Sequence, residues 1–153
     1  MRGAGFDLVG FLYLALVTPE LCRIDVADHR LPNALVVPGI AVAAIGVVFE
    51  GLAEQRMPGE AAVAAVAVGG FFLLLAVAGG VGFGDVKLSL ALALAGGGAS
   101  ATIVLGTVVL GFIGAGVVAL TAIAARGAAA SLAFGPYLLG GFWASVAALP
   151  LLG

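Results

Sequence analysis

Six apolar segments, separated by short polar or glycine-rich breaks, restrict what this chain can fold into. They run from about Phe6 to Leu21, Ala34 to Val48, Ala61 to Ala78, Asp85 to Ala95, Thr102 to Ala125 and Ser131 to Leu152. A helix of about 20 apolar residues crosses a bilayer core about 30 Å thick. Within that core every backbone N–H and C=O must be bonded inside the protein, which a helix achieves. The pattern therefore predicts an all-α, polytopic transmembrane bundle of about six helices, forming one membrane-embedded domain over residues 1–153.

The composition excludes several other classes of protein. Hydrophobic residues make up 63% and charged residues 9% of the 153 residues, whereas soluble domains carry about 25% charged residues. A net charge of −2 gives nucleic acid little to bind, so we expect no nucleic-acid partner. The single cysteine excludes a disulfide scaffold and a four-thiolate zinc site, and we expect no metal or other cofactor. The 25 glycines predict helices that pack closely on one another.

The fourth segment is short. As a helix, Asp85 to Ala95 would rise only about 16 Å, or half of a bilayer core, and it is followed by Gly96-Gly97-Gly98. The segment fits either a short helix or the first part of a bent one, and the choice sets the topology of the chain.

With six spans, the connections after the first, third and fifth lie on one side of the membrane. That side holds Arg23, Arg30, Lys87 and Arg126, and the other side holds Arg2 and Arg56. Because Lys and Arg favour the cytoplasmic side, the regions around Asp25 and Asp85 are predicted to face the cytoplasm. The chain is then a multi-pass protein of the cell membrane.

Two carboxylic acids near membrane depth, Asp25 and Asp85, are the first candidates for a functional site. An ionisable group there is costly and by default marks function. Helix capping is the alternative, and it accounts for Asp85 at a helix start better than for Asp25 near a helix end. Gly82 and Gly84 precede Asp85 and allow another extended chain to come close.

The residues around these acids have plainer interpretations as well. Asp25 is followed after four residues by Arg30-Leu31-Pro32-Asn33, in which Pro32 and Asn33 fit a turn and a helix start. Lys87 fits a side chain that extends to the membrane interface. Asp28 is a rival of Asp25 for any chemical role.

Two facing carboxyl groups would supply a specific chemistry. At a separation of a few ångströms they share one proton, because both cannot ionise together. The ionised group then takes a proton from water while the protonated group donates one to a peptide carbonyl, which hydrolyses the peptide without metal or nucleophile. Spacing alone does not show that Asp25 and Asp85 meet.

Three sequence pieces together resemble a known family, the type IV prepilin peptidases, which are intramembrane aspartic proteases of the GxGD class. The pieces are Asp25 to Asn33, Gly82-Phe83-Gly84-Asp85-Val86-Lys87, and Phe134-Gly135-Pro136-Tyr137. The resemblance implies a bundle of about six helices with Asp25 and Asp85 as the catalytic pair near the cytoplasmic face. Asp28 does not fit the family spacing. The matching positions that would support catalysis or bind substrate are Gly82, Gly84, Lys87, Arg30, Pro32 and Asn33.

The resemblance also implies a substrate, the short, positively charged leader of a type IV prepilin or pilin-like pseudopilin, cut just after a glycine before its hydrophobic helix. Larger members carry a zinc-binding cysteine segment and an N-methyltransferase activity. This chain has only Cys22 and is expected to be the minimal, protease-only form. A proton-coupled transporter or channel subunit, or an inactive scaffold, is the alternative function. Homo-oligomer formation and the pilus or secretion system served stay open.

Overall fold

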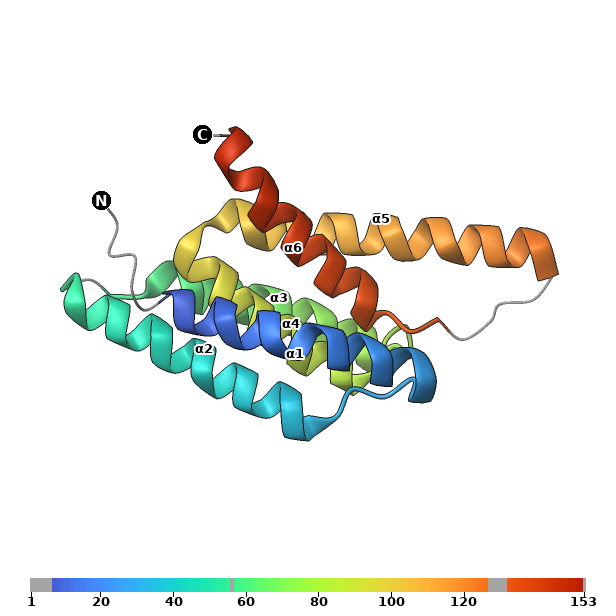
Figure 1. Cartoon of the computed structure of the whole chain (residues 1–153), viewed down its shortest axis with the longest axis horizontal. Helices are drawn as coiled ribbons and strands as arrows, with labels where there is room; N and C mark the ends of the chain where they lie inside the picture. The colour runs from blue at the N-terminus through green and yellow to red at the C-terminus, as the bar shows by residue number, and fades with distance from the viewer. Residues whose placement is uncertain (1–6, 56, 127–131, 153) are drawn as a thin grey trace.

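All regular secondary structure in the part of the chain that the structure describes is helical. The structure is a computed structural model that describes residues 7–55, 57–126 and 132–152. The helices are α1 (Asp7–Asp28), α2 (Asn33–Ala53), α3 (Gly59–Val77), α4 (Phe83–Ala99), α5 (Ala101–Arg126) and α6 (Gly135–Leu152) (Figure 1). The prediction of an all-α bundle of about six helices is confirmed.

Helix α4 is the central element of the bundle, because it contacts each of the other five helices. Leu88 and Leu92 on α4 are each 1% exposed. They belong to a core that also contains Phe72 of α3 and Leu138 and Phe142 of α6. Most of the helix that holds Asp85 is therefore packed against other helices.

Glycines bring neighbouring helix backbones together, as the composition predicts. A Cβ atom placed on Gly141 of α6 would lie 2.7 Å from the backbone oxygen of Thr107 on α5. A Cβ atom on Gly97 of α4 would lie 3.0 Å from the Cα atom of Ala61 on α3. Real Cβ atoms would force these helices apart, so glycine permits the close packing.

Helix α4 is longer than the apolar segment Asp85 to Ala95, because it continues through Gly96-Gly97-Gly98 to Ala99. A glycine costs up to about 1 kcal/mol in a helix relative to alanine. Here that cost is offset by the approach of α3, which Gly97 allows. The observed helix of 17 residues rises about 25 Å, most of a bilayer core.

Helix α1 also extends further than its apolar segment predicts. It runs through the polar residues after Leu21 and ends at Asp28. His29 follows with φ 51°, in the left-handed region, and its N–H donates to the backbone oxygen of Asp25 at 2.9 Å. Asp25 thus lies in the last turn of α1 rather than in a connection after it.

Some residues used in the sequence analysis lie outside the described residues. They are Arg2, Phe6, Arg56 and Ser131. The last apolar segment was predicted to begin at Ser131, and α6 begins at Gly135.

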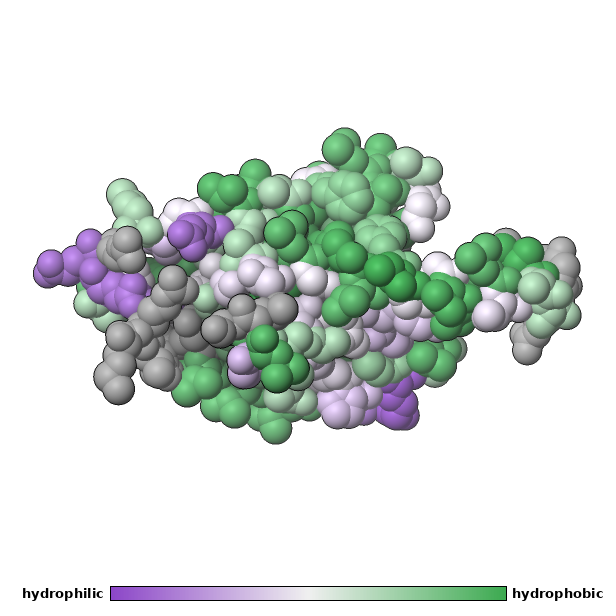
Figure 2. Space-filling view, turned by 90° about the horizontal axis from the view of Figure 1, so that it is seen from above, coloured by the Kyte–Doolittle hydropathy of each residue, from purple (hydrophilic) through white to green (hydrophobic). Residues whose placement is uncertain are grey.

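The outer surface of the bundle is strongly apolar. Three of the helices in the described residues are long and apolar enough to cross a membrane, namely Asn33–Ala53, Gly59–Val77 and Ala101–Ala125. Their outward side chains include Leu74, 72% exposed, and Leu105, 67% exposed. Figure 2 shows hydrophobic side chains over much of one face, with strongly hydrophilic ones at its left end and lower right. Apolar surface of this extent suits lipid rather than water.

Candidate active site

Two buried carboxylic acids, Asp25 and Asp85, lie near one another at one end of the bundle. Asp25, in the last turn of α1, is 4% exposed, and Asp85, in the first turn of α4, is 8% exposed. They are close enough for the charge of Asp25 to act on Asp85. The structure therefore brings together the two acids selected from the sequence, whereas their catalytic role stays a prediction.

The carboxylate of Asp25 is held by a residue distant in sequence. The backbone N–H of Gly135, the first residue of α6, donates a hydrogen bond to Asp25 Oδ2 at 3.0 Å, and this bond is buried. Figure 1 shows the start of α6 beside the end of α1. The sequence analysis missed Gly135 as a site residue: the Gly-Pro-aromatic segment indicates the region but not which atom contacts the acid.

The carboxylate of Asp85 is held within its own turn. The backbone N–H of Gly82 donates to Asp85 Oδ2 at 3.2 Å, and the N–H of Asp85 donates to the Gly82 oxygen at 3.1 Å. This is the capping interaction considered from the sequence. Both acids consequently lie at the N-terminus of a helix, Asp85 on α4 and Asp25 against α6, where unpaired N–H groups favour negative charge.

Leu31, in the connection between α1 and α2, packs between the segments that hold the two acids. A Cβ atom on Gly84 would lie 2.9 Å from Leu31 Cβ and 3.4 Å from the Leu31 nitrogen. A Cβ atom on Gly135 would lie 3.4 Å from Leu31 Cδ2. Leu31 is itself buried, so one apolar side chain spaces the start of α4 from the start of α6. The close approach of Leu31 therefore accounts for a glycine at position 84.

The other predicted site residues surround this centre in different ways. Lys87 Nζ donates to Asn33 Oδ1 at 2.9 Å, so Lys87 joins α4 to α2. Pro32 precedes α2, and its oxygen accepts a hydrogen bond from the Leu35 nitrogen at 3.0 Å. Arg30 and Asp28 are exposed. The structure does not bury them with the two acids.

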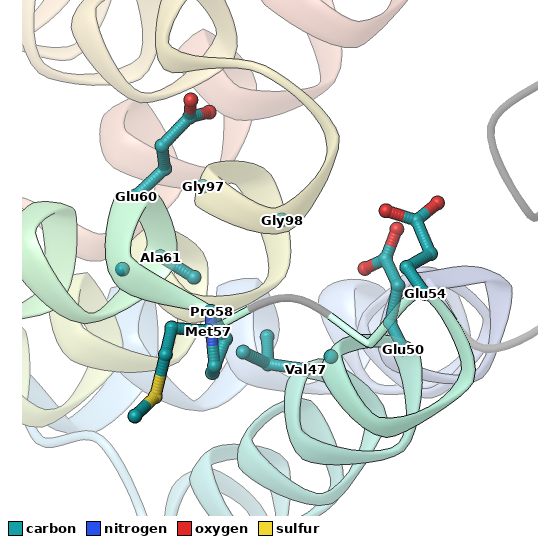
Figure 3. A pocket seen from close by; sticks show the side chains of 11 residues that line it. Val47, Glu50, Glu54, Met57, Pro58, Glu60, Ala61, Gly97 and Gly98 are labelled. Carbon is teal, nitrogen blue, oxygen red and sulfur yellow. The ribbon is translucent and has the colours of Figure 1, made fainter.

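A pocket of about 190 Å³ lies elsewhere, where α2 ends, α3 begins and α4 ends. It is lined by Val47, Glu50, Gly51, Glu54, Met57, Pro58, Gly59, Glu60, Ala61, Gly97 and Gly98. Figure 3 shows the carboxyl groups of Glu50 on α2, of Glu54 directly after the end of α2, and of Glu60 on α3. Because Asp85 lies at the opposite end of α4, this pocket is separate from the site of the two acids.

A metal centre is not built by the residues that the structure describes. Among them there is no group of three or more His, Cys, Asp or Glu side chains that could hold a metal ion. Asp25 and Asp85 each contact a backbone amide instead.

A comparison with protein families gives one match, to a family described as the type IV leader peptidase family, over residues 10–123. The matched stretch covers more than half of the chain and includes Asp25 and Asp85, whereas Gly135 lies beyond it. No curated protein and no solved structure matches the chain.

Proposed function

The chain belongs to the type IV leader peptidase family, and from this premise we propose that it is an intramembrane aspartic endopeptidase that removes the leader peptides of type IV prepilins or pilin-like proteins. Family membership makes the chain a peptidase, and its apolar helices make it a membrane protein. The aspartic mechanism, the substrate and the topology are the parts that we propose.

The observation that carries the proposal is the buried pair of Asp25 and Asp85. They come from different helices, the charge of Asp25 acts on Asp85, and each acid is oriented by a backbone N–H. Two carboxyl groups in such proximity share one proton. Burial in an apolar bundle strengthens the interaction between them, because the local dielectric constant is low.

The proposed reaction needs only this pair and a water molecule. The ionised carboxylate takes a proton from water as the water oxygen attacks the scissile peptide carbon. The protonated carboxyl donates its proton to the carbonyl oxygen, which gives a tetrahedral intermediate. Collapse of the intermediate breaks the C–N bond: the leaving nitrogen takes a proton from the pair, and one of the two hydroxyl groups of the intermediate returns a proton to the pair as the C=O bond re-forms. One water is consumed and the pair again holds one proton.

We propose further that all six helices lie in the cell membrane as a multi-pass bundle with the acids toward the cytoplasm. The excess of Arg and Lys on that side supports this orientation. The substrate would approach in the bilayer, with its hydrophobic helix in lipid and its positively charged leader at the cytoplasmic surface.

The test is cleavage of a candidate prepilin co-expressed with this chain in cells without a leader peptidase of their own. The unmodified chain should shorten the prepilin. Asp25→Asn and Asp85→Asn should each abolish cleavage while the protein stays folded in the membrane, and the double variant should be no worse than either, because the pair acts as a unit.

Asp28→Asn is the matched control, because it changes an exposed acid of the same helix, and it should keep substantial activity. Loss of activity in Asp28→Asn with retention in Asp25→Asn would show that the wrong acid had been chosen. Full activity in Asp85→Asn would eliminate the aspartic mechanism. A chain that cleaves none of the prepilins supplied, and instead moves protons across vesicles, would favour the transporter alternative.

A further inference from the structure

The contact between α1 and the start of α6 has a feature that the proposed mechanism does not use. Asp25 Oδ2 and the Gly135 nitrogen are 3.0 Å apart in a buried hydrogen bond between residues separated by 110 positions. Asp85 has a comparable bond, but its donor, Gly82, lies three residues away in the same turn. Asp85 is thus oriented by its own helix, while Asp25 depends on another part of the chain.

The side chain of Asp25 crowds position 135. A Cβ atom on Gly135 would lie 2.6 Å from Asp25 Oδ2 and 3.3 Å from Asp25 Cγ. Both distances are shorter than ordinary van der Waals contact, so the carboxylate or the helix would have to move. Gly140, on the same helix, shows nothing within 4 Å of an added Cβ atom. An added methyl group is therefore crowded by Asp25 at position 135 and meets nothing at position 140.

The start of α6 is fixed in place by packing on its other sides. The ring of Phe134 lies 5.8 Å from that of Phe72 and 5.0 Å from that of Phe112, measured between centroids. The backbone oxygen of Phe134 accepts hydrogen bonds from the nitrogens of Tyr137 at 3.1 Å and Leu138 at 3.2 Å. The Gly135 amide is thus presented by a helix start anchored to α3 and α5.

We propose that Gly135 is a positioning residue of the peptidase: its backbone N–H fixes the carboxylate of Asp25 relative to Asp85. This inference rests on the proposed function and adds a third chain segment to the site, from beyond residues 10–123, which the family comparison matches. Gly135 acts through Asp25 and touches neither water nor substrate in the reaction.

The first experiment compares Gly135→Ala with the matched control Gly140→Ala on one purified prepilin substrate. Displacing a reacting group by about 1 Å can cost roughly a hundredfold in rate. Gly135→Ala should lower kcat by about that factor, with KM within about twofold of the unmodified protein, while Gly140→Ala should change neither. Equal kcat values for the two variants, or a loss confined to KM, would overturn the positioning role.

The second experiment measures the contact without any reaction. Thermal unfolding in detergent is followed for Gly135→Ala, Asp25→Ala and the double variant. If the added methyl group collides with Asp25, Gly135→Ala should lower Tm by about 3 °C when Asp25 is present and by much less when it is alanine. Equal Tm losses in both backgrounds would overturn the contact.

The two readouts separate this inference from the proposed function. A chain that cleaves no prepilin would overturn the proposed function and with it the catalytic role of Gly135, whether or not the thermal cycle shows coupling. A chain that cleaves prepilin through Asp25 and Asp85 but shows neither the kcat loss nor the coupling would keep the function and overturn only the role of Gly135.

Discussion

Lys87 Nζ on α4 donates a hydrogen bond to Asn33 Oδ1, at the first residue of α2, over 2.9 Å. The bond joins two helix starts: Asp85 lies two residues before Lys87, and Leu31 lies two residues before Asn33. The bond therefore links the first turns of α4, which hold Asp85, to the end of the α1–α2 connection, which contains Leu31.

Removing either end of this bond should have the same effect. A hydrogen bond to a charged group contributes about 1.5–3 kcal/mol at most, and less here because the pair is partly exposed to solvent. We expect Lys87→Met and Asn33→Ala each to lower prepilin cleavage several-fold. The double variant should be no worse than either, because one interaction is lost in all three. Losses that add in the double variant, measured from cleavage time courses, would show that the two residues act separately.

The two glycines before Asp85 should differ in their tolerance of alanine. A Cβ atom on Gly84 would lie 2.9 Å from Leu31 Cβ, whereas the nearest atom to one on Gly82 is Asp85 Oδ2, at 3.5 Å. Gly82 has φ −79° and ψ 154°, which alanine adopts readily. Gly84→Ala should cost about 1–3 kcal/mol in unfolding free energy and most of the activity, while Gly82→Ala should stay near the unmodified protein. Equal sensitivity, by thermal unfolding and cleavage, would contradict the packing explanation of Gly84.

The aromatic cluster beside α6 gives a stability prediction. Phe72 is fully buried, and its ring contacts those of Phe71, Phe112 and Phe134. Phe72→Ala should lower the free energy of unfolding by about 3–5 kcal/mol. Phe71→Ala is the neighbouring control, and because its side chain is 45% exposed, the loss should be clearly smaller. Unfolding in detergent measures both, and a larger loss for Phe71→Ala would contradict the burial described here.

The orientation in the membrane is testable with single cysteines. In a Cys22→Ala background, Met57→Cys places a thiol at a side chain that is 93% exposed, in the connection between α2 and α3. Asp28→Cys places one at the end with the two acids. An impermeant thiol reagent added outside intact cells should label Cys at 57 and leave Cys at 28 unlabelled until the membrane is opened. The reverse pattern would place the acids outside the cell.

The proposed mechanism also predicts how cleavage responds to reagents. Two carboxyl groups activate water without a metal ion, thiol or serine nucleophile. Cleavage by the purified protein should therefore persist in strong chelators and after treatment with serine- or cysteine-directed reagents. Loss of cleavage in a chelator, restored by zinc, would require a metal-dependent mechanism.

The helical fold is predictable from the sequence, whereas helix ends are less so. Apolar runs fix the presence of helices because a lipid-exposed backbone must satisfy its own hydrogen bonds. The apolar segment that predicts α4 stops at Ala95, whereas the helix continues to Ala99, because the low helix propensity of glycine is a local quantity. The approach of α3 at Gly97 is tertiary and outweighs it.

The same distinction applies to the site. Asp25 and Asp85 stand out in the sequence because ionisable residues are rare in such a chain. Gly135 does not, because its contribution is a backbone amide, which every residue except proline carries. Whether the Gly135 amide reaches Asp25 depends on where α6 begins in space relative to α1. That position is set by the packing of Leu31 and Phe134.

The long sequence separation of Asp25 and Gly135 affects when the site can form. A ribosome adds residues in order, so both acids are synthesised before the amide that orients one of them. On the proposed topology, a nascent chain with α1 to α5 already in the bilayer holds both carboxyl groups but leaves Asp25 without the amide of Gly135. On the proposed role of Gly135, newly made protein gains full activity only when α6 docks against α1, so insertion of this helix sets the moment at which proteolysis begins.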